Sequence, residues 1–460
     1  MDTIAAIATG SAPTAIGVIR VSGPETDAVV SRVFRPKCAK PFSALEPRRL
    51  FLGALTDRAG RTLDSGMAVR FPGPASYTGE DSAEFHCHGS PAAMGEILSA
   101  LFAAGARQAR PGEFTRRAFL NGKLELTQAE AVIDLIDAQT PAAARNAAAQ
   151  LDGALGRTVG QVYDELTALA SQFYAVVDYP DEDIEDLDRT KLEDTLRRAD
   201  GTLTRLLDTC GRGRVLRQGV PTAIVGLPNA GKSSLLNALA GYDRAIVTSV
   251  PGTTRDTVEE SVLCGGVLLR LTDTAGIRET DDAVERLGVE RSRSAAQRAE
   301  LVLAVADGSA PLSPENEAVF ALAARCPRWV LVWSKADLAA GPQPVKFWTP
   351  PPGLSAPAAE VAVSSVTGEG LDRLEDAVRA LFPAGEAPAG QILTNARQSE
   401  AVSRARDAVR RALEALECGM TPDVILTDAE EAMNALGELT GRTAREDIVS
   451  NIFSRFCVGK

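Results

Sequence analysis

Hydrophobic positions change their spacing along the chain, and each change indicates a different kind of structure. Up to residue 118, short apolar runs rich in β-branched side chains alternate with Gly, Pro and Ser. This pattern predicts strands at Ile16–Val21, Met67–Phe71 and Ala83–Cys87, with helices near Glu25–Phe34 and Pro91–Ala104. We therefore expect residues 1–118 to form an α+β domain.

The spacing becomes helical over residues 119–215. Val132, Leu135 and Ile136 lie at positions i, i+3 and i+4, and the same spacing continues from Val162 through Leu166, Leu169 and Phe173 to Val176. An acidic run at 181–188 interrupts the helices, and we interpret it as a solvated turn rather than a metal site.

Helical spacing returns over residues 383–460. Two capping boxes, Thr427 with Glu430 and Thr443 with Glu446, each precede an apolar periodic stretch and predict the start of a helix. Between the two helical segments, in residues 216–382, apolar strands alternate with helices, which is typical of a parallel sheet. The predicted architecture is an α+β domain followed by a discontinuous helical domain into which an α/β domain is inserted.

Composition restricts the class of protein. The chain has 460 residues, with 49 Lys and Arg against 61 Asp and Glu, so its net charge is −12. Such an acidic chain is not expected to hold nucleic acid over a broad surface. Seven scattered cysteines, with no apparent signal peptide or spanning apolar run, predict reduced thiols and a cytoplasmic location.

The α/β segment contains a phosphate-binding motif. Gly226-Leu-Pro-Asn-Ala-Gly231-Lys232-Ser233 matches G-x-x-x-x-G-K-S and follows the apolar stretch Ala223–Val225. Backbone N–H groups of such a loop bind phosphates, the lysine reaches the β- and γ-phosphates, and the serine hydroxyl holds Mg²⁺. The catalytic role of Lys232 and the Mg²⁺ role of Ser233 are predicted on this basis.

Two further motifs follow in the order expected of a GTPase. Asp273-Thr-Ala-Gly276 comes after the predicted strand Val267–Leu271, and Ser334-Lys335-Ala336-Asp337 comes after Trp329–Trp333. Asp337 can accept hydrogen bonds from the guanine N1–H and 2-amino groups together, whereas adenine offers no such donor pair. Ser334 stands where Asn is commonest, so we expect guanine selection to rest on Asp337.

The nucleotide site is completed by a first switch at 248–256, in which Thr254 is expected to sense Mg²⁺, and by a last turn at 364–366. The residues expected to contact GTP, GDP or their cations are Asn229, Ala230, Gly231, Lys232, Ser233, Ser234, Thr248, Ser249, Val250, Pro251, Gly252, Thr253, Thr254, Asp273, Thr274, Ala275, Gly276, Ser334, Lys335, Ala336, Asp337, Ser364, Ser365 and Val366. Ile277 occupies the position where small signalling GTPases carry a water-orienting Gln, so the catalytic group must lie elsewhere. From the residues alone, Asn229 is interpreted as a turn former and Glu285 as a solvated helix residue.

Several stretches together resemble the tRNA-modification GTPase family MnmE (TrmE). They are PNAGKSSLLNALAG, PGTTRD, DTAGIRETDDAVERLG, GEDSAEFHCHG, the stretch 109–138 and the terminal FCVGK. The resemblance extends over the whole chain. It implies GTP hydrolysis within modification of the 5-position of wobble uridine in certain tRNAs, giving carboxymethylaminomethyl-type products.

The resemblance also assigns catalytic roles. It implies that K⁺ is bound by Asn229 together with Thr248, Val250 and Thr253 of the first switch, and that Glu285 orients the attacking water. It implies a homodimer whose GTPase domains associate across nucleotide, so turnover should depend on potassium and on dimerisation.

The resemblance further implies that the amino-terminal domain binds a 5-formyl-tetrahydrofolate-like ligand. It also implies that this domain mediates dimerisation. The matching positions are Arg20, Glu84 and Lys123, with Lys460 from the carboxyl terminus; the stretch Gly10–Gly17 is less glycine-rich than usual in the family. The expected partner is the flavin-dependent MnmG (GidA), in a heterotetramer or larger complex that provides most of the tRNA affinity.

Three further sequence features lie outside the nucleotide motifs. His86, Cys87 and His88 could suggest zinc, but they lack a second ligand pair, so a metal is disfavoured. Cys457 does not fit a prenylation box, and its role in modification or in structure stays open. We expect a confined basic patch at Arg107, Arg110, Arg116 and Arg117.

Two other classes of protein fit the sequence less well. An RNA-binding ribosome-assembly GTPase would need an added RNA-binding module. A lipid-anchored switch would need a terminal lipidation box. The sequence shows neither.

Overall fold

The computed structural model describes residues 2–10, 12–178, 188–242, 260–271, 294–338, 348–383, 387–443, 446–454 and 456–459. Contacts within the chain divide it into two compact units. The first comprises Met1–Ile133, Gln150–Asp200 and Ala401–Lys460, and the second comprises Asp134–Ala149 and Gly201–Glu400. The predicted α+β, helical and α/β segments are all present.

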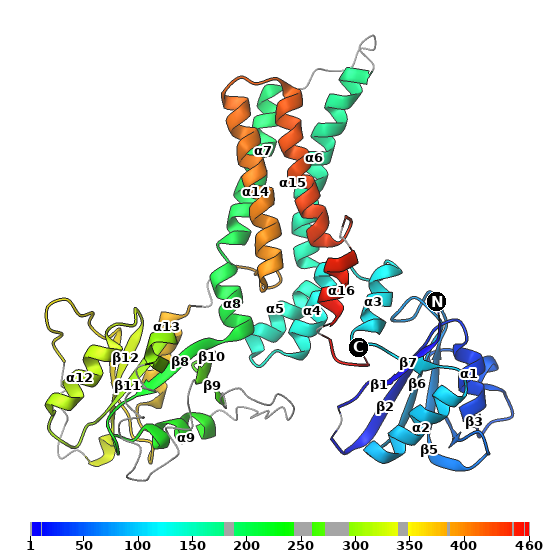
Figure 1. Ribbon diagram of the computed structural model, residues 1–460, viewed down its shortest axis with the longest axis horizontal. Helices are drawn as coiled ribbons and strands as arrows, with labels where there is room; N and C mark the ends of the chain where they lie inside the picture. Colours follow the sequence, from blue (N-terminus) through cyan, green and yellow to red (C-terminus); the bar gives the residue numbers. More distant parts are fainter. Residues whose placement is uncertain are drawn as a thin grey trace. The chain divides into compact units, whose positions relative to one another are not determined.

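A seven-stranded sheet forms the amino-terminal part of the first unit, in the order β3-β4-β5-β6-β2-β1-β7 (Figure 1). Its strands are β1 (Ile4–Ile7), β2 (Thr14–Ser22), β3 (Phe34–Pro36), β4 (Phe51–Thr56), β5 (Thr62–Phe71), β6 (Ser82–Gly89) and β7 (Arg107–Gln108). All pairings are antiparallel except that of β1 with β7. The three strands predicted from the sequence lie within β2, β5 and β6 and are confirmed.

Two helices, α1 (Thr26–Val33) and α2 (Pro91–Ala103), bury the apolar face of this sheet. The side chain of Ser90 accepts a hydrogen bond from the Ala93 amide, and Pro91 occupies the first turn, so the sequence marks the start of α2 clearly. The fully buried side chains of Phe34 and Phe85 are part of the core between the sheet and the helices. Both predicted helices are confirmed.

The rest of the first unit consists of helices that precede the α/β segment in the sequence and helices that follow it. They include α3 (Glu113–Leu120), α6 (Ala154–Asp178), α15 (Pro422–Thr440), α16 (Glu446–Ser454), and the larger parts of α4 (Leu126–Ile136), α7 (Arg189–Leu207) and α14 (Ala396–Glu417). Helix α6 packs along α15, and Arg410 of α14 pairs with Asp200 of α7 at 2.6 Å. Helices that precede and follow the α/β segment therefore pack together, as expected of an interrupted helical domain.

One predicted helix start is wrong. Helix α15 begins at Pro422, after Thr421, so Thr427 lies inside the helix. The Thr427 hydroxyl donates to the carbonyl of Asp423 one turn earlier instead of capping a helix end. The second capping box at Thr443 does precede a helix, α16, which begins at Glu446.

The second unit is built on a six-stranded sheet in the order β13-β12-β11-β8-β10-β9 (Figure 1). Its strands are β8 (Val220–Val225), β9 (Glu260–Cys264), β10 (Val267–Leu271), β11 (Leu301–Asp307), β12 (Trp329–Ser334) and β13 (Ala359–Ala362). Only the β9–β10 pair is antiparallel. The predicted parallel α/β sheet is therefore confirmed, with a core on each face.

The helices of this unit are α5 (Pro141–Leu151, except its last two residues), α8 (Cys210–Gln218), α9 (Lys232–Tyr242), α12 (Pro314–Ala323) and α13 (Leu371–Leu381). Helix α8 leads directly through Gly219 into β8, the strand that precedes the phosphate-binding motif. Helix α8 is also held by the segment that leaves the α/β part: the Leu393 amide donates to the Thr209 hydroxyl at 3.0 Å.

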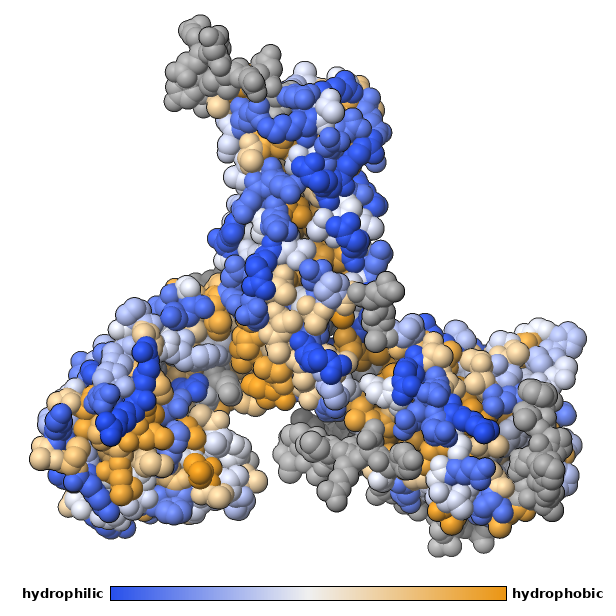
Figure 2. Space-filling view, turned by 180° about the vertical axis from the view of Figure 1, so that it is seen from behind, coloured by the Kyte–Doolittle hydropathy of each residue, from blue (hydrophilic) through white to orange (hydrophobic). Residues whose placement is uncertain are grey.

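No helix in the described part of the chain is both long and apolar enough to cross a membrane. Hydrophilic residues cover most of the visible face of the helical bundle (Figure 2). All seven cysteines are free thiols, as the sequence predicted.

Candidate functional site

The phosphate-binding motif forms a tight loop between β8 and α9. Asn229 and Gly231 adopt positive φ angles of 62° and 91°, conformations that Gly and Asn tolerate best. The Lys232 ammonium turns back over the loop and donates to the carbonyls of Gly226 and Leu227 at 3.0 and 2.8 Å. Burial lowers the pKa of Lys232. The loop therefore presents a lysine and the amino end of α9 together, the arrangement that binds phosphate.

The other nucleotide motifs lie at the same edge of the sheet. Strands β8, β11, β12 and β13 are parallel, so their carboxyl ends meet there. Ser334 ends β12, and Ser364 follows shortly after β13. The structure thus brings together Asn229–Ser234, Ser334–Asp337 and Ser364–Val366, as the sequence predicted for one nucleotide site.

The polar side chains of the Ser334–Asp337 motif have different partners. Ser334 is buried, and its hydroxyl lies 2.6 Å from the Ala230 carbonyl of the phosphate loop. Lys335 pairs with Asp307 at 2.6 Å, and Asp337 is exposed, with one carboxylate oxygen accepting from the Ser364 hydroxyl at 2.7 Å. Burial would raise the pKa of Asp307, but hydrogen bonds from Lys335 and Ser309 outweigh it and lower that pKa. Asp307 was missed in the sequence, although its place at the end of an apolar strand was a usable signal.

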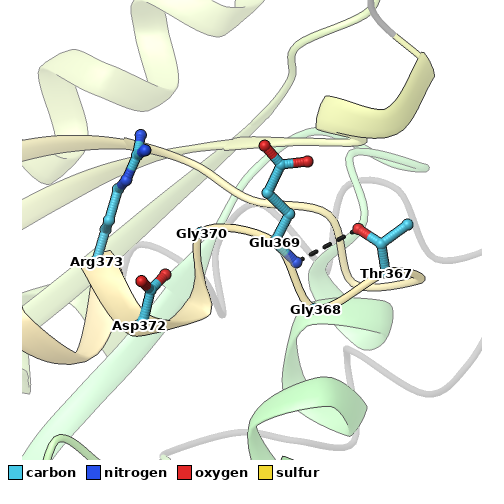
Figure 3. Close-up of a pocket in the computed structure, with 6 residues that line it drawn as sticks. All are labelled: Thr367, Gly368, Glu369, Gly370, Asp372 and Arg373. Carbon is cyan, nitrogen blue, oxygen red and sulfur yellow. Dashed lines mark hydrogen bonds between the residues drawn. The ribbon is translucent and has the colours of Figure 1, made fainter.

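The last turn continues into an open hollow of about 510 Å³. Val366 is 85% exposed at its edge, and the hollow is lined by Thr367, Gly368, Glu369, Gly370, Asp372 and Arg373. Figure 3 shows the Glu369 amide donating to the Thr367 hydroxyl, which closes the turn. This hollow follows the nucleotide motif in sequence and is lined mainly by polar groups.

Part of the predicted site lies outside the described residues. These are Thr248, Ser249, Val250, Pro251, Gly252, Thr253 and Thr254 of the first switch, Asp273, Thr274, Ala275 and Gly276 of the second motif, Glu285, and Lys460. Their assigned roles stay predictions.

The amino-terminal sheet joins two of the predicted folate-site residues. Arg20 on β2 faces Glu84 on β6, and its Nε donates to a Glu84 oxygen at 2.8 Å. The Arg20 guanidinium also lies over the rings of Tyr77 and Phe114, at 5.2 and 5.6 Å. Tyr77 and Phe114 carried no sequence signal, because an aromatic residue alone predicts burial as readily as binding.

The remaining two folate-site positions are less well defined. Lys123 is exposed, and its ammonium donates to the Pro74 carbonyl at 3.1 Å. Gly459, next to Lys460, packs against β1: a Cβ built on it would lie 2.2 Å from the Ile7 carbonyl. Ala6, beside Ile7, pairs with Arg20 across β1 and β2, so the carboxyl-terminal segment reaches the strand next to Arg20.

The prediction of a basic patch is wrong. Arg117 is buried and pairs with Asp2, Glu80 and Glu113, and Arg107 pairs with Asp2 and Glu113. These two arginines neutralise carboxylates within the domain, so they do not form a surface that binds the phosphates of a nucleic acid. Of the four expected arginines, only Arg110 is exposed and Arg116 is half-buried.

His86 and His88 lie beside different carboxylates, those of Glu84 and Asp64. His88 Nδ1 lies 2.8 Å from Asp64, while burial raises the pKa of Cys87 to about 11 and keeps its thiol protonated. Among the described residues, no group of three or more His, Cys, Asp or Glu side chains could hold a metal ion.

A phosphate-binding loop, a Ser-Lys-Ala-Asp motif that begins at the end of β12 and a largely parallel sheet define the α/β part of the second unit as a P-loop GTPase domain. Residues 126–457 match the MnmE helical domain, and residues 3–123 match the GTP-binding protein TrmE N-terminus. The chain belongs to the tRNA modification GTPase MnmE family. It is a GTP hydrolase that acts in tRNA modification.

Similar proteins match over the full length of this chain. They include the tRNA modification GTPases MnmE of Heliobacterium modesticaldum (43% identical over 467 residues), Akkermansia muciniphila (42% over 461) and Roseiflexus castenholzii (44% over 469). Each alignment covers 100% of this chain and 99% of the relative.

Proposed function

We propose that this GTPase is potassium-activated and works as a homodimer with an MnmG (GidA) partner, using a one-carbon folate to modify the 5-position of wobble uridine in certain tRNAs. The potassium proposal is supported by the surroundings of the Asn229 side chain. Asn229 is exposed in the phosphate loop, and its side chain makes no hydrogen bond to another described residue. Its carboxamide oxygen is therefore free to bind a cation beside the phosphates.

The donor types suit the proposed ions. Asn229 provides a neutral oxygen, and Ser233, in the first turn of α9, provides the hydroxyl expected for Mg²⁺. A bound cation would supply positive charge against the charge that develops on the transferred phosphoryl group. Lys232 holds the loop carbonyls in the described structure and is positioned at the phosphate end of the site.

The experiment compares GTP turnover in KCl and NaCl at several protein concentrations. We expect faster turnover in KCl and a rate per subunit that rises with concentration. Equal rates in both salts at all concentrations would remove potassium activation and dimer dependence while leaving a GTPase. Asn229→Ala is expected to abolish the difference between the salts while GDP still binds.

Glu285 is tested separately. We propose that it orients the attacking water, so Glu285→Ala should leave nucleotide binding nearly intact while hydrolysis falls steeply. Unchanged turnover would refute that role.

The folate proposal is supported by the surroundings of Arg20. The Arg20 side chain is only 17% exposed, and beyond its bond to Glu84 it makes no further hydrogen bond to a described residue. Its terminal N–H groups can therefore pair with a ligand carboxylate, and Tyr77 and Phe114 provide aromatic faces nearby. Arg20→Met should weaken binding of 5-formyl-tetrahydrofolate in titration calorimetry, whereas Arg49→Met, a change of an exposed arginine in the same domain, should not.

The partner proposal is supported by charge. Arg107 and Arg117 are paired within the domain, and the bundle arginines Arg404, Arg410 and Arg411 are paired with carboxylates as well. We therefore assign most tRNA affinity to MnmG. Titration of labelled tRNA with each protein alone and with both tests this: tight binding by this chain alone would contradict the assignment.

A further inference from the structure

Ser334 is buried at the point where β12 reaches the phosphate loop. It is only 2% exposed, and its hydroxyl lies 2.6 Å from the Ala230 carbonyl and 3.1 Å from the Ala306 carbonyl of β11. A Cβ built on Gly231 would lie 3.1 Å from both Cβ and Oγ of Ser334, so the loop approaches the strand closely here. The hydroxyl links the phosphate loop to the central strands of the sheet.

This contact uses the only proton that the side chain has. A serine hydroxyl has one O–H, and both of its neighbours are carbonyl oxygens, which can only accept. The major-groove edge of guanine presents N7 and O6, which are also acceptors. Ser334 therefore has no donor left for that edge of the base. An asparagine would bring two N–H donors and could contact the loop and the base at once.

The next two side chains of the motif do not replace the missing donor. The Lys335 ammonium is held by Asp307 at 2.6 Å. Asp337, when ionised, only accepts hydrogen bonds, and the Ser364 hydroxyl holds one of its oxygens at 2.7 Å. Its carboxylate suits the N1–H and 2-amino edge of guanine, which leaves N7 without a side-chain donor from this motif.

We propose that Ser334 is a positioning residue that fixes the phosphate loop, and that the nucleotide site leaves guanine N7 unread. The site then accepts guanine nucleotides that lack N7 as well as it accepts the natural ones. The inference rests on the proposed role of Asp337 as the reader of the opposite edge of the base.

The test measures the affinity of the full chain for GDP, 7-deaza-GDP and ADP by titration calorimetry. A hydrogen bond of ordinary strength corresponds to roughly a two- to twelvefold change in Kd. We expect GDP and 7-deaza-GDP to bind within about twofold of each other, with ADP much weaker. A larger loss for 7-deaza-GDP, with GDP still preferred over ADP, would overturn this inference alone. Equal binding of ADP and GDP would overturn the role of Asp337 and this inference with it.

Two substitutions of Ser334 distinguish a role in positioning the phosphate loop from a role in binding guanine N7. Ser334→Ala should weaken GDP and 7-deaza-GDP together, by roughly fivefold, and leave their ratio unchanged, because it frees the loop without touching the base. Ser334→Asn should restore a preference for GDP over 7-deaza-GDP. Unchanged affinities in Ser334→Ala would refute the link to the loop, and a changed ratio would refute the unread N7.

A matched control lies at the opposite end of the same strand. The Ser355 hydroxyl also donates to a main-chain carbonyl, that of Ala324 at 2.8 Å, and its own carbonyl accepts from the indole of Trp329, the first residue of β12. Ser355→Ala removes a similar hydrogen bond far along β12 from the nucleotide motifs. It should leave both affinities unchanged, and an equal loss there would attribute the Ser334→Ala effect to general loosening of the sheet.

Discussion

Gly213 of α8 lies directly against the main-chain carbonyl of Leu393. A Cβ built on Gly213 would stand 1.7 Å from that oxygen and 2.6 Å from its carbon, so only glycine allows this approach. The helix that enters the α/β part of the chain and the segment that leaves it are thus in backbone contact.

Replacing Gly213 tests how firmly this contact holds the second unit. Gly213→Ala should destabilise it by about 1–3 kcal/mol, because both opposing atoms belong to the backbone and cannot swing away. The midpoint of thermal unfolding should fall. Gly211→Ala is the control, since a Cβ at Gly211 in the same helix meets nothing within 4 Å; it should be neutral or slightly stabilising. Equal destabilisation by both changes would contradict the steric explanation.

A buried carboxylate lies beside the same segment. The Thr394 hydroxyl donates to Asp134 at 2.7 Å, and Arg217 of α8 lies 3.0 Å from the other oxygen of Asp134. Thr394→Val should cost about 1–3 kcal/mol, because it removes a donor from a buried charge. Urea unfolding measures the loss, and Thr394→Ser, which keeps the hydroxyl, should recover most of it. A loss as large in Thr394→Ser would point to packing of the methyl group instead.

The paired carboxylates of the first unit predict its response to acid. Burial would raise the pKa of Glu113, but hydrogen bonds from Arg107, the Arg110 amide and Arg117 lower it from 4.5 to about 2. A carboxyl group whose pKa is lowered on folding stabilises the fold above its unfolded pKa and loses that contribution as pH falls through the folded value. Glu113 should therefore contribute on the order of 3 kcal/mol, lost between about pH 4.5 and pH 2.

Glu113→Gln should flatten the dependence of unfolding free energy on pH within that window. Urea titrations of both proteins at several pH values between 5 and 2.5 provide the measurement. Glu46→Gln, which changes an exposed carboxyl group paired with Arg49, is the control and should leave the slope unchanged. A wild-type slope in Glu113→Gln would show that other carboxyl groups dominate.

Guanine selection is tested at Asp337. We expect its carboxylate to accept from two donors of guanine, whereas an amide at this position would pair with the extra carbonyl of xanthine. Asp337→Asn should weaken GDP by about 100-fold or more and improve binding of xanthosine diphosphate. Asp372→Asn, which changes another exposed carboxylate beside the last turn, should alter neither affinity. Continued preference for GDP in Asp337→Asn would contradict the role assigned to this residue.

Local patterns predicted the elements of this fold well. Strands β2, β5 and β6 and helices α1 and α2 each carry a spacing or a cap that lies within a few residues of sequence. The false start at Thr427 has a local cause too. Thr and Glu at i and i+3 also occur inside a helix, and only the earlier Thr421-Pro422 pair distinguishes the true start.

The sequence predicted the nucleotide site better than it predicted the contacts of the amino-terminal domain. The nucleotide motifs lie at strand ends of one parallel sheet, so their meeting follows from topology. Arg20 and Glu84 are 64 positions apart, and only strand register joins them, so nothing in their spacing announced the pair. The prediction of a basic patch failed for the same reason, because Arg117 pairs with Asp2 and Glu80, which come from distant segments of the sequence.

The interrupted helical domain has a consequence for biosynthesis. Helices α6 and α7 leave the ribosome before the α/β segment, and α14 and α15, which pack on them, follow only after it. At roughly 5–20 residues per second, the nascent α6 and α7 wait on the order of ten seconds or more with their apolar faces uncovered. Gly459, which packs against β1 of the amino-terminal sheet, is added only when translation ends. The α/β GTPase segment can therefore fold before the helical bundle of the first unit is complete.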